Sequence, residues 1–320
     1  MCGYDTAMRW LVALLVLTAS HCWAQYPARP VRLVVGFAPG GGTDLIARLL
    51  AQKLTERWGQ PVVVENRLGA SGNIAAEVVA KSPADGYTLL HAFSSHASNA
   101  ALSKLPFDIT KDFSAISLVA SGPAVVLAHP SAARTLPELI AYAKTHPGAI
   151  KYGSSGVGTT VHLAGELMQQ LTGTQMVHVP YKGIAPAMTA ILAGDIQLTY
   201  ATPISAGAHL KSGRLIALAV AGTSRFPTLP DVPTAAEAGL PGYEIEFWYA
   251  LLGPAGMPAS LVARIQREVA AIVTAPDMKE SMLAQGAIAI GSRPEELNAL
   301  IAREYARWAE LVKMRGVKAE

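Results

Sequence analysis

Residues 37–44, Phe-Ala-Pro-Gly-Gly-Gly-Thr-Asp, have the composition of a turn that binds an anion. They follow a short apolar, β-branched run at 31–36, which predicts a strand covered on both faces. Apolar residues at helical spacing continue to position 58, and Thr43 and Asp44 are residue types that cap a helix start. A strand that enters a helix through glycines leaves unpaired backbone N–H groups at the positive end of the helix dipole. We therefore expect an anion here. The alternative is a tight turn without a ligand, in which Asp44 only caps its own helix.

A second stretch of the same kind occupies residues 153–160, Gly-Ser-Ser-Gly-Val-Gly-Thr-Thr. It lies between a short strand predicted at 149–152 and a helix predicted over 161–172. Its backbone and hydroxyl groups are candidate donors to an anion, and His162 in the first helical turn either faces the ligand or packs in the core. Two such helix starts suit a ligand that carries negative charge at one or both ends.

Strands and helices alternate around the first loop. Strands predicted at 61–65 and 87–93 enclose a helix over 73–81, which is typical of a parallel sheet with helices on its faces. Ligands of such sheets lie beyond the carboxyl ends of the strands. Two further loops should reach this edge, and their hydroxyl groups add candidate ligand contacts: Ser71, Ser94 and Ser95.

The run at 113–130 is too long for one strand and is broken by Ser-Gly-Pro at 121–123. We interpret it as a strand in one sheet, a crossing, and a strand at 124–128 in a second sheet. A strand at 246–252 returns to the first sheet, and Trp248 and Tyr249 on it either line a pocket or are buried aromatics beside the crossing. The sequence thus predicts an α/β protein of two lobes with mostly parallel sheets, two crossover strands and a ligand cleft between the lobes. The predicted boundaries are 25–121 plus 247–320 for the first lobe and 122–246 for the second.

Two capping boxes predict helix starts later in the chain. Thr-Leu-Pro-Glu at 135–138 opens a helix in the second lobe. Ser-Arg-Pro-Glu at 292–295 opens the last helix, which has an apolar stripe of Leu297, Ile301, Tyr305 and Trp308. We expect two helices to close the chain.

Length and charge narrow the class of protein. The chain has 320 residues, and its formal charge of +3 arises from dispersed side chains, which does not favour a nucleic-acid partner. Residues 1–24 combine a basic residue, an apolar run shorter than the roughly 20 residues of a membrane-spanning helix, and a small-residue cleavage signal. They predict an export signal peptide that contains both cysteines, so the mature chain should have no disulfide and no cysteine-ligated metal. Two alternatives stay open, a start at Met8 and lipid attachment at Cys22.

Motifs of catalysis are missing from the sequence. The loop at 37–44 has no lysine for a phosphate loop, neither loop reads G-x-G-x-x-G, and no G-x-S-x-G or H-E-x-x-H occurs. His91 and His96 are the closest pair of histidines and have no obvious third metal ligand. We therefore expect no catalytic residue, no metal and no cofactor. The alternative is an enzyme on the same fold that acts on a small acid through a serine or threonine.

Ordered motifs along the whole mature chain resemble one family. In addition to residues 37–44 they are Val-Glu-Asn-Arg at 64–67, Pro-Ala-Asp-Gly-Tyr-Thr-Leu-Leu at 83–90, Leu-Pro-Phe-Asp at 105–108, Tyr-Lys-Gly at 181–183, Leu-Pro-Asp-Val-Pro-Thr at 229–234 and Leu-Gly-Pro-Ala-Gly at 252–256. In these motifs the chain resembles the periplasmic substrate-binding proteins of tripartite tricarboxylate transporters, also called the Bug family.

The resemblance implies a two-lobed, type II periplasmic binding protein fold that closes on a small carboxylate, either a di- or tricarboxylate or an aromatic acid. It implies a periplasmic, monomeric, non-enzymatic receptor that delivers its ligand to membrane permease subunits, or else a ligand-binding partner of a sensor. In the family the Pro-Gly-Gly loop, here Pro39 to Thr43, holds one ligand carboxylate, and the second-lobe Gly/Ser loop supplies further donors. Many relatives have an aspartate where this chain has Ala-Thr at 201–202, which disfavours an amino-acid ligand.

The predicted ligand site draws on both lobes. First-lobe candidates are Phe37, Ala38, Pro39, Gly40, Gly41, Gly42, Thr43, Asp44, Ser71, Ser94 and Ser95. Second-lobe candidates are Ser154, Ser155, Gly156, Gly158, Thr159, Thr160, His162 and Thr202, and the return strand adds Trp248.

Overall fold

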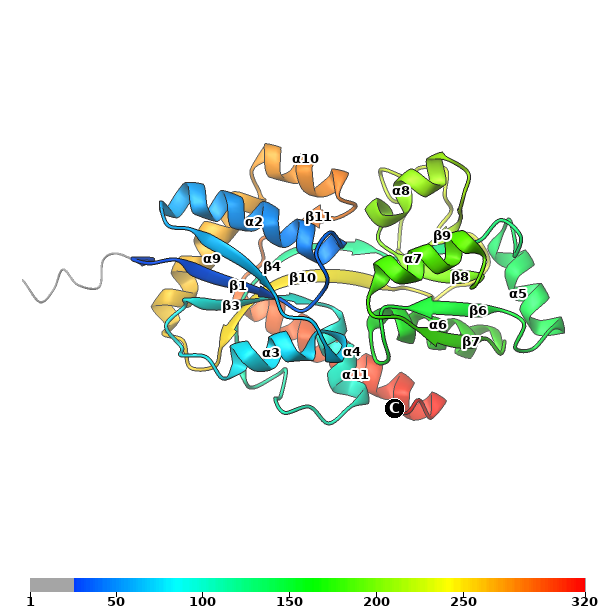
Figure 1. Ribbon diagram of the computed structural model, residues 1–320, viewed down its shortest axis with the longest axis horizontal. Coiled ribbons are helices and arrows are strands. Elements are labelled where there is room, and N and C mark those ends of the chain that lie inside the picture. Colours follow the sequence, from blue (N-terminus) through cyan, green and yellow to red (C-terminus); the bar gives the residue numbers. More distant parts are fainter. Residues whose placement is uncertain (1–25, 320) are drawn as a thin grey trace, which may run out of the picture.

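The computed structural model describes residues 26–319, which form two lobes side by side (Figure 1). The predicted signal peptide, residues 1–24, lies outside the described residues. Each lobe is built on one β-sheet with helices packed against it, as the sequence predicts.

The first lobe contains a six-stranded sheet in the order β11-β4-β10-β3-β1-β2. Its strands are β1 (Val31–Val35), β2 (Val62–Asn66), β3 (Thr88–Phe93), β4 (Phe113–Pro123), β10 (Glu246–Pro254) and β11 (Ile288–Ala289). β1 is parallel to both β2 and β3, whereas β10 is antiparallel to β3 and β4. The predicted parallel pairing therefore holds for β1, β2 and β3, which are joined through helices. The returning strand β10 is antiparallel to its neighbours because it enters from the other lobe.

Helices cover both faces of this sheet. They are α2 (Gly42–Trp58), α3 (Asn73–Ala80), α4 (Ser95–Leu102), α9 (Ala259–Val273), α10 (Pro276–Ala284) and α11 (Pro294–Arg315). Figure 1 shows α2 on one face and α3, α4 and α11 on the other. Side chains of β10 alternate between the two apolar clusters on these faces, since successive strand residues point in opposite directions.

The second lobe contains a five-stranded sheet in the order β7-β6-β8-β5-β9. Its strands are β5 (Val125–Ala128), β6 (Lys151–Ser154), β7 (Val177–Pro180), β8 (Leu198–Ala201) and β9 (Ile216–Val220). Its helices are α5 (Leu136–Thr145), α6 (Thr160–Thr172), α7 (Ile184–Ala193) and α8 (Pro203–Lys211). The capping box predicted at the start of α5 is confirmed, with Thr135 and Glu138 bonded to each other's backbone N–H groups.

The lobes are joined where the chain crosses between the two sheets. β4 ends at Pro123 and β5 begins two residues later, which confirms the predicted crossing. Ala124 N donates to Ile245 O (2.9 Å), so the outgoing and returning segments are hydrogen-bonded side by side. The two crossings thus form one hydrogen-bonded connection between the lobes.

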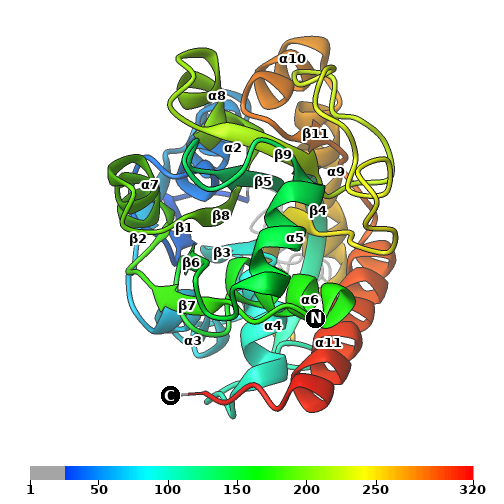
Figure 2. The same cartoon turned by 90° about the vertical axis from the view of Figure 1, so that its right-hand side faces the viewer.

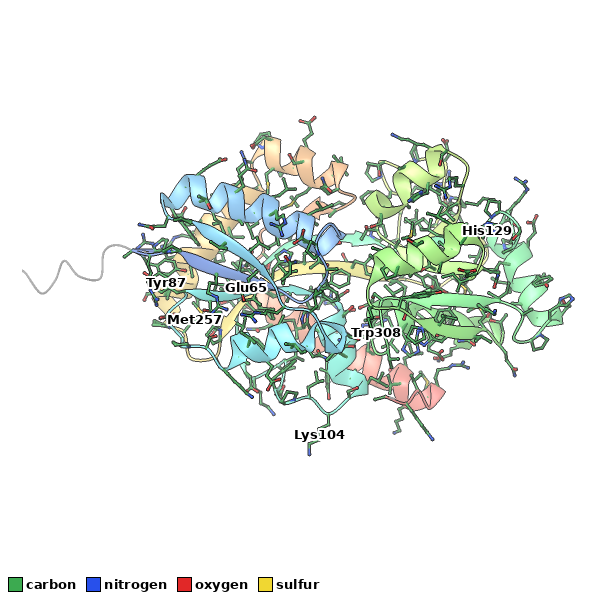
Figure 3. All side chains as sticks on the ribbon, viewed as in Figure 1. Glu65, Tyr87, Lys104, His129, Met257 and Trp308 are labelled. Carbon is green, nitrogen blue, oxygen red and sulfur yellow. The ribbon has the colours of Figure 1, made fainter. Side chains whose placement is uncertain are left out.

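Helix α11 also links the lobes. It runs past the first sheet and lies beside α6 of the second lobe (Figure 2), where Arg315 Nε contacts Glu166 Oε2 at 3.1 Å. Trp308, labelled in Figure 3 where the lobes meet, is 1% exposed and donates from Nε1 to Glu304 Oε2 (3.2 Å). Tyr305, which was predicted in the buried stripe, is instead 39% exposed.

The C-terminal region differs from the prediction in two ways. Three helices and the short strand β11 follow β10, rather than two helices. The last helix has Arg293 at its N-cap position in place of Ser292, and Glu296 in place of Glu295 accepts from the backbone there, at Arg293 N (2.9 Å). The Ser292 hydroxyl instead accepts from Leu118 N (2.9 Å) on the neighbouring strand β4. Within residues 26–319, no helix has both the length and the apolar character needed to span a bilayer.

Candidate functional site

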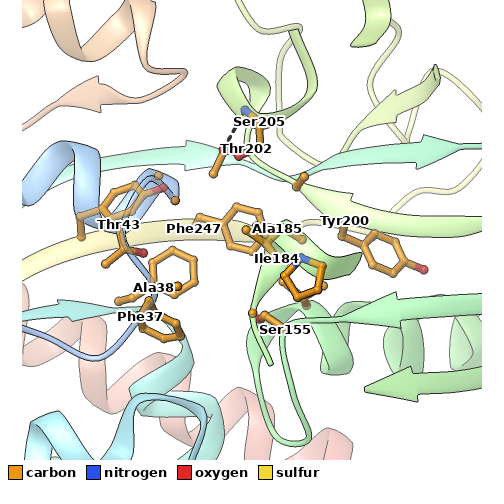
Figure 4. Close-up of a pocket in the computed structure, with 18 of the residues that line it drawn as sticks. Phe37, Ala38, Thr43, Ser155, Ile184, Ala185, Tyr200, Thr202, Ser205 and Phe247 are labelled. Carbon is orange, nitrogen blue, oxygen red and sulfur yellow. Dashed lines mark hydrogen bonds between the residues drawn. The ribbon is translucent and has the colours of Figure 1, made fainter. Parts of the chain in front are cut away.

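A pocket opens between the two lobes, beside the turn from β1 into α2 (Figure 4). Its empty space, including open solvent at the mouth, is about 630 Å³. The predicted site residues that line it are Phe37, Ala38, Pro39, Gly41, Gly42, Thr43, Ser155 and Thr202. The glycine loop of the first lobe is thus at the pocket, whereas most of the second-lobe candidates are elsewhere.

Asp44 stabilises the glycine loop and does not cap α2. Its carboxylate is 2% exposed and accepts from Gly40 N (3.0 Å), Asn66 Nδ2 (2.9 Å) and Arg48 Nε (2.8 Å). Burial raises the pKa of Asp44, but these bonds together outweigh it and hold the pKa below its usual value. The prediction that Thr43 or Asp44 caps α2 is wrong: the helix begins after Gly41, which has no side-chain capping bond.

Unpartnered polar groups face the pocket at the start of α2. Among hydrogen bonds within residues 26–319, the hydroxyls of Thr43 and Tyr249 take part in none, although Thr43 is only 7% exposed and Tyr249 1% exposed. A Cβ placed on Gly42 would lie 3.2 Å from the Tyr249 hydroxyl oxygen and 3.5 Å from Thr202 Oγ1. Glycine at position 42 therefore keeps open the point where both lobes meet the start of α2.

Two helices of the second lobe, α7 and α8, also begin at this pocket. Helix α8 is capped by Thr202, whose Oγ1 accepts from Ser205 N (3.4 Å) and lies 2.9 Å from Ser205 Oγ (Figure 4). Helix α7 follows Gly183 without a side-chain cap, and residues 183–186 line the pocket. Of the residues at these two helix starts, only Thr202 was predicted to contact the ligand. The only local signal for α7 was a glycine before an apolar helical run.

Aromatic rings form much of the remaining wall. Phe93 lies with its ring centroid 5.5 Å from Phe37, 5.4 Å from Phe247 and 5.3 Å from Tyr249. Further lining side chains that sequence reasoning missed come from the second lobe: Val161, Tyr200, Ala201 and Ser205. Among the residues that line the pocket in the described chain, none carries a charge.

The second glycine-rich loop reaches the pocket through Ser155, and most of its other predicted residues contact the first lobe or their own lobe. Its partners in the first lobe are η1 (Ala70–Gly72) and α4, a helix absent from our prediction. Thr160 donates from Oγ1 to Ser94 Oγ (3.0 Å) and from its backbone N to Ser95 Oγ (3.3 Å). Ser98 Oγ donates to Gly158 O (2.7 Å), and Ser71 Oγ donates to Val157 O (3.0 Å). We call this set of contacts the α4–α6 interface.

Other predicted site residues of the second loop have partners within their own lobe. Thr159 caps α6 by accepting from His162 N (3.3 Å) and donates to Gly156 O (2.7 Å). His162 stacks on His178 with ring centroids 3.9 Å apart, and Ser154 Oγ lies 2.6 Å from His178 Nε2. This geometry matches the alternative in which His162 packs in the core and does not face the ligand.

Trp248 also lies away from the pocket. It is fully buried in the apolar cluster beneath α3 and α11, whereas its neighbours Phe247 and Tyr249 line the pocket. The sequence suggested an aromatic wall at this point of the chain, and strand alternation decides which aromatic residues form it.

One buried imidazole lies behind the pocket wall. His91 is 0% exposed, and its ring stacks on Tyr249 with centroids 6.1 Å apart. Within the described residues neither ring nitrogen has a hydrogen-bond partner. Burial, with a smaller contribution from His96, lowers the pKa of His91 to about 3, so the ring is neutral at physiological pH.

Comparison with known proteins identifies the family. Residues 46–317 match the model of the tripartite tricarboxylate transporter family receptors. The chain is 37% identical over 297 residues to protein BugT of Bordetella pertussis, covering 92% of this chain and 91% of that protein.

Solved structures agree. A structure of Rpa4515 from R. palustris with adipate superimposes with a TM-score of 0.87 at 36% identity, covering 92% of this chain and 99% of that one. MatC from Rhodopseudomonas palustris with bound malate superimposes with a TM-score of 0.84 at 32% identity, covering 90% of this chain and all (100%) of that one. The two-lobed periplasmic binding protein fold predicted from the sequence is thus confirmed, and the chain belongs to the tripartite tricarboxylate transporter receptor family.

Proposed function

We propose that this chain is a periplasmic receptor that binds a small carboxylate between its lobes and delivers it to the membrane permease of a tripartite tricarboxylate transporter. Its family membership supports the receptor role. The related structures named for bound adipate and malate support a carboxylate as the ligand.

The observation that carries the proposal is the uncapped start of α2 at the interlobe pocket. The first backbone N–H groups of a helix have no intrahelical acceptor, and they stabilise a nearby anion together with the helix dipole by roughly 0.3–1 kcal/mol per contact. The unpartnered hydroxyls of Thr43 and Tyr249 add neutral donors beside them. A carboxylate bound here would replace water at these groups without an arginine or lysine.

Closure of the lobes would complete the site. Gly42 and Tyr249 approach Thr202 from the opposite lobe, and α7 begins at the same pocket. A ligand in contact with both lobes favours the closed arrangement by its differential affinity for the two states. The permease would then recognise the closed receptor, which we propose acts as a monomer.

A thermal-shift and calorimetry screen of the mature chain tests this function. Ligand at a hundredfold excess over its dissociation constant should stabilise the receptor by about 2.7 kcal/mol. Carboxylates should raise the melting temperature, while their amide or alcohol analogues should not. If no carboxylate in a broad panel of mono-, di- and tricarboxylates shifts the melting temperature, the proposal is wrong.

Recovery of the ligand separates a receptor from an enzyme built on the same fold. After incubation with the protein, the bound acid should be recovered unchanged by NMR. Conversion of the acid to a product would favour the enzyme. Loss of uptake of that acid in cells that lack the chain would support delivery to a permease over a role as partner of a sensor.

A further inference from the structure

We propose that the ligand is a carboxylate with a hydrocarbon body, either a ring or an unsubstituted chain, and not a hydroxylated acid. This inference rests on the proposed function and specifies the ligand class of the same pocket. It concerns the body of the ligand, because most side chains that line the pocket are apolar.

The wall of the pocket offers few partners for a strongly polar body. Among its described residues none is charged, and two of its hydroxyl groups, those of Thr202 and Ser205, are 2.9 Å apart and already bonded to each other. Thr202 Oγ1 also accepts from the backbone at the start of α8. A hydroxylated acid would lose water from each hydroxyl on binding without regaining an equal number of hydrogen bonds.

Hydroxyl groups without a partner occur at the start of α2, and Ser155 and the uncapped start of α7 add donors on the second-lobe side. The hydroxyls of Thr43 and Tyr249 and the start of α2 meet around Gly42, where a Cβ would be 3.2 Å from the Tyr249 oxygen. Both side chains are more than nine-tenths buried, at 7% and 1% exposure. A buried hydroxyl that lacks a partner and faces a pocket indicates a polar ligand group at that point, and the adjacent helix dipole favours a negative one.

The other side chains of the wall are mainly apolar. Phe37, Phe93 and Phe247 cover the first-lobe side, and Val161, Ile184 and Pro186 cover the second-lobe side. Phe93 packs against three aromatic neighbours at 5.3–5.5 Å, which makes this side of the wall a continuous apolar surface. Burial of hydrocarbon against these side chains is favourable, while burial of hydroxyl groups there is not.

Matched pairs of acids test this inference directly. Hexanoate and gluconate share chain length and one carboxylate, adipate and galactarate share chain length and two, and benzoate and quinate share a six-membered ring. Calorimetry on the mature chain should give at least tenfold tighter binding for the hydrocarbon member of any pair that binds. Equal or tighter binding of a hydroxylated member would overturn the inference, as would binding of malate or citrate with no binding of any hydrocarbon acid.

These outcomes are distinct from failure of the proposed function. If hydroxylated acids bind better, the chain is still a carboxylate receptor and only the ligand class is wrong. If none of the acids binds, the receptor proposal itself falls and this inference falls with it.

The same substitution at two positions tests whether the pocket wall causes the preference for hydrocarbon acids. Ile184→Thr keeps a β-branched side chain at the first position of α7 but adds a hydroxyl to the apolar wall, and it should reduce the ratio of hydrocarbon to hydroxylated affinity several-fold. Ile74→Thr makes the same change on α3, where the side chain is 43% exposed and outside the pocket lining, and should leave the ratio unchanged. An unaltered ratio in Ile184→Thr, or an equal reduction in both variants, would contradict the assignment of this wall.

Discussion

Two glycine-rich helix starts of this protein look alike in sequence and do different things in the structure. The loop before α2 opens onto the pocket, and its helix begins at Gly41 with no side-chain cap. The loop before α6 is capped by Thr159, and the next residue, Thr160, is bonded to Ser94 and Ser95 across the lobes. The first start keeps its donors available for a ligand. At the second start, side chains of the protein already accept hydrogen bonds from the backbone donors.

The glycines of the two loops differ in the same way. At Gly42 the missing side chain leaves room beside Tyr249 and Thr202. At Gly158, which has a φ of +77°, a Cβ would lie 2.6 Å from Asn99 Oδ1, so glycine is needed for the lobes to approach closely. The comparison indicates that the N–H groups at a helix start stay available for a ligand only where no neighbouring side chain already accepts from them.

The largest effect should come from filling the space at Gly42. Gly42→Val places a branched side chain against the Tyr249 hydroxyl and Thr202, and we expect at least a hundredfold loss of ligand affinity, equivalent to about 2.7 kcal/mol. Stability should change little, because Gly42 does not have a positive φ. Calorimetry and urea unfolding measure the two quantities.

Gly41→Ala is the matched control in the same loop. A Cβ there meets only Ala38 O at 3.6 Å, an ordinary contact, so affinity should fall less than about threefold. Equal losses in both variants would indicate that the loop is sensitive to any side chain, and the role given to the open space at Gly42 would be wrong.

Thr160→Val tests the α4–α6 interface. The substitution preserves shape but removes the bond to Ser94 Oγ, a side chain that is 0% exposed. Leaving a buried hydroxyl with one partner fewer should lower the free energy of unfolding by about 1–3 kcal/mol, measured by urea denaturation. A variant with wild-type stability would argue against this interface as a structural contact.

Thr43→Val makes the same chemical change on the other helix start and should have the opposite consequence. Its hydroxyl has no partner among the described residues, so stability should stay within about 0.5 kcal/mol of the parent. Ligand affinity should fall roughly three- to tenfold through loss of one hydrogen bond. If Thr43→Val destabilises the fold while Thr160→Val weakens only binding, the contrast between the two helix starts is reversed and our site is misplaced.

Acidification should produce the smallest effect, through Asp44. Its pKa in the folded chain is below the ordinary value of 3.8, so ionised Asp44 stabilises the fold above that pH. This contribution is lost as pH falls below 3.8 towards the folded pKa. The difference in unfolding free energy between the parent and Asp44→Asn should therefore be largest above about pH 5 and shrink below about pH 4. A difference that does not vary with pH would mean that the carboxylate charge is unimportant for the glycine loop.

Local signals explain which parts of the fold could be predicted from the sequence. The β1–α2 turn and the α5 capping box depend on residues adjacent in the chain, and both predictions placed their elements correctly. Helix α4 was missed because its residues, Ser-His-Ala-Ser-Asn-Ala-Ala-Leu, have little apolar periodicity, and no side chain caps it. It is stabilised by packing on α11 and α6 instead.

The pocket was only half predictable for a related reason. The glycine loop and Thr202 could be recognised from local composition. Of the two aromatic candidates on β10, Tyr249 lines the wall and Trp248 does not, because the sequence does not tell which face of β10 meets the pocket. The start of α7 was overlooked because its residues are apolar and carry no polar side chain that would indicate a site.

The sequence by itself determined the two-lobed α/β architecture, the point of crossing near Pro123 and the candidate anion loop at 37–44. Only the tertiary structure decided which helix starts remain free. That choice depends on Ser94 and Ser95 meeting Thr160, 66 and 65 positions away along the chain. Hydrogen-bond donors are a property of the local backbone, whereas their satisfaction depends on whatever the fold brings within about 3 Å of them.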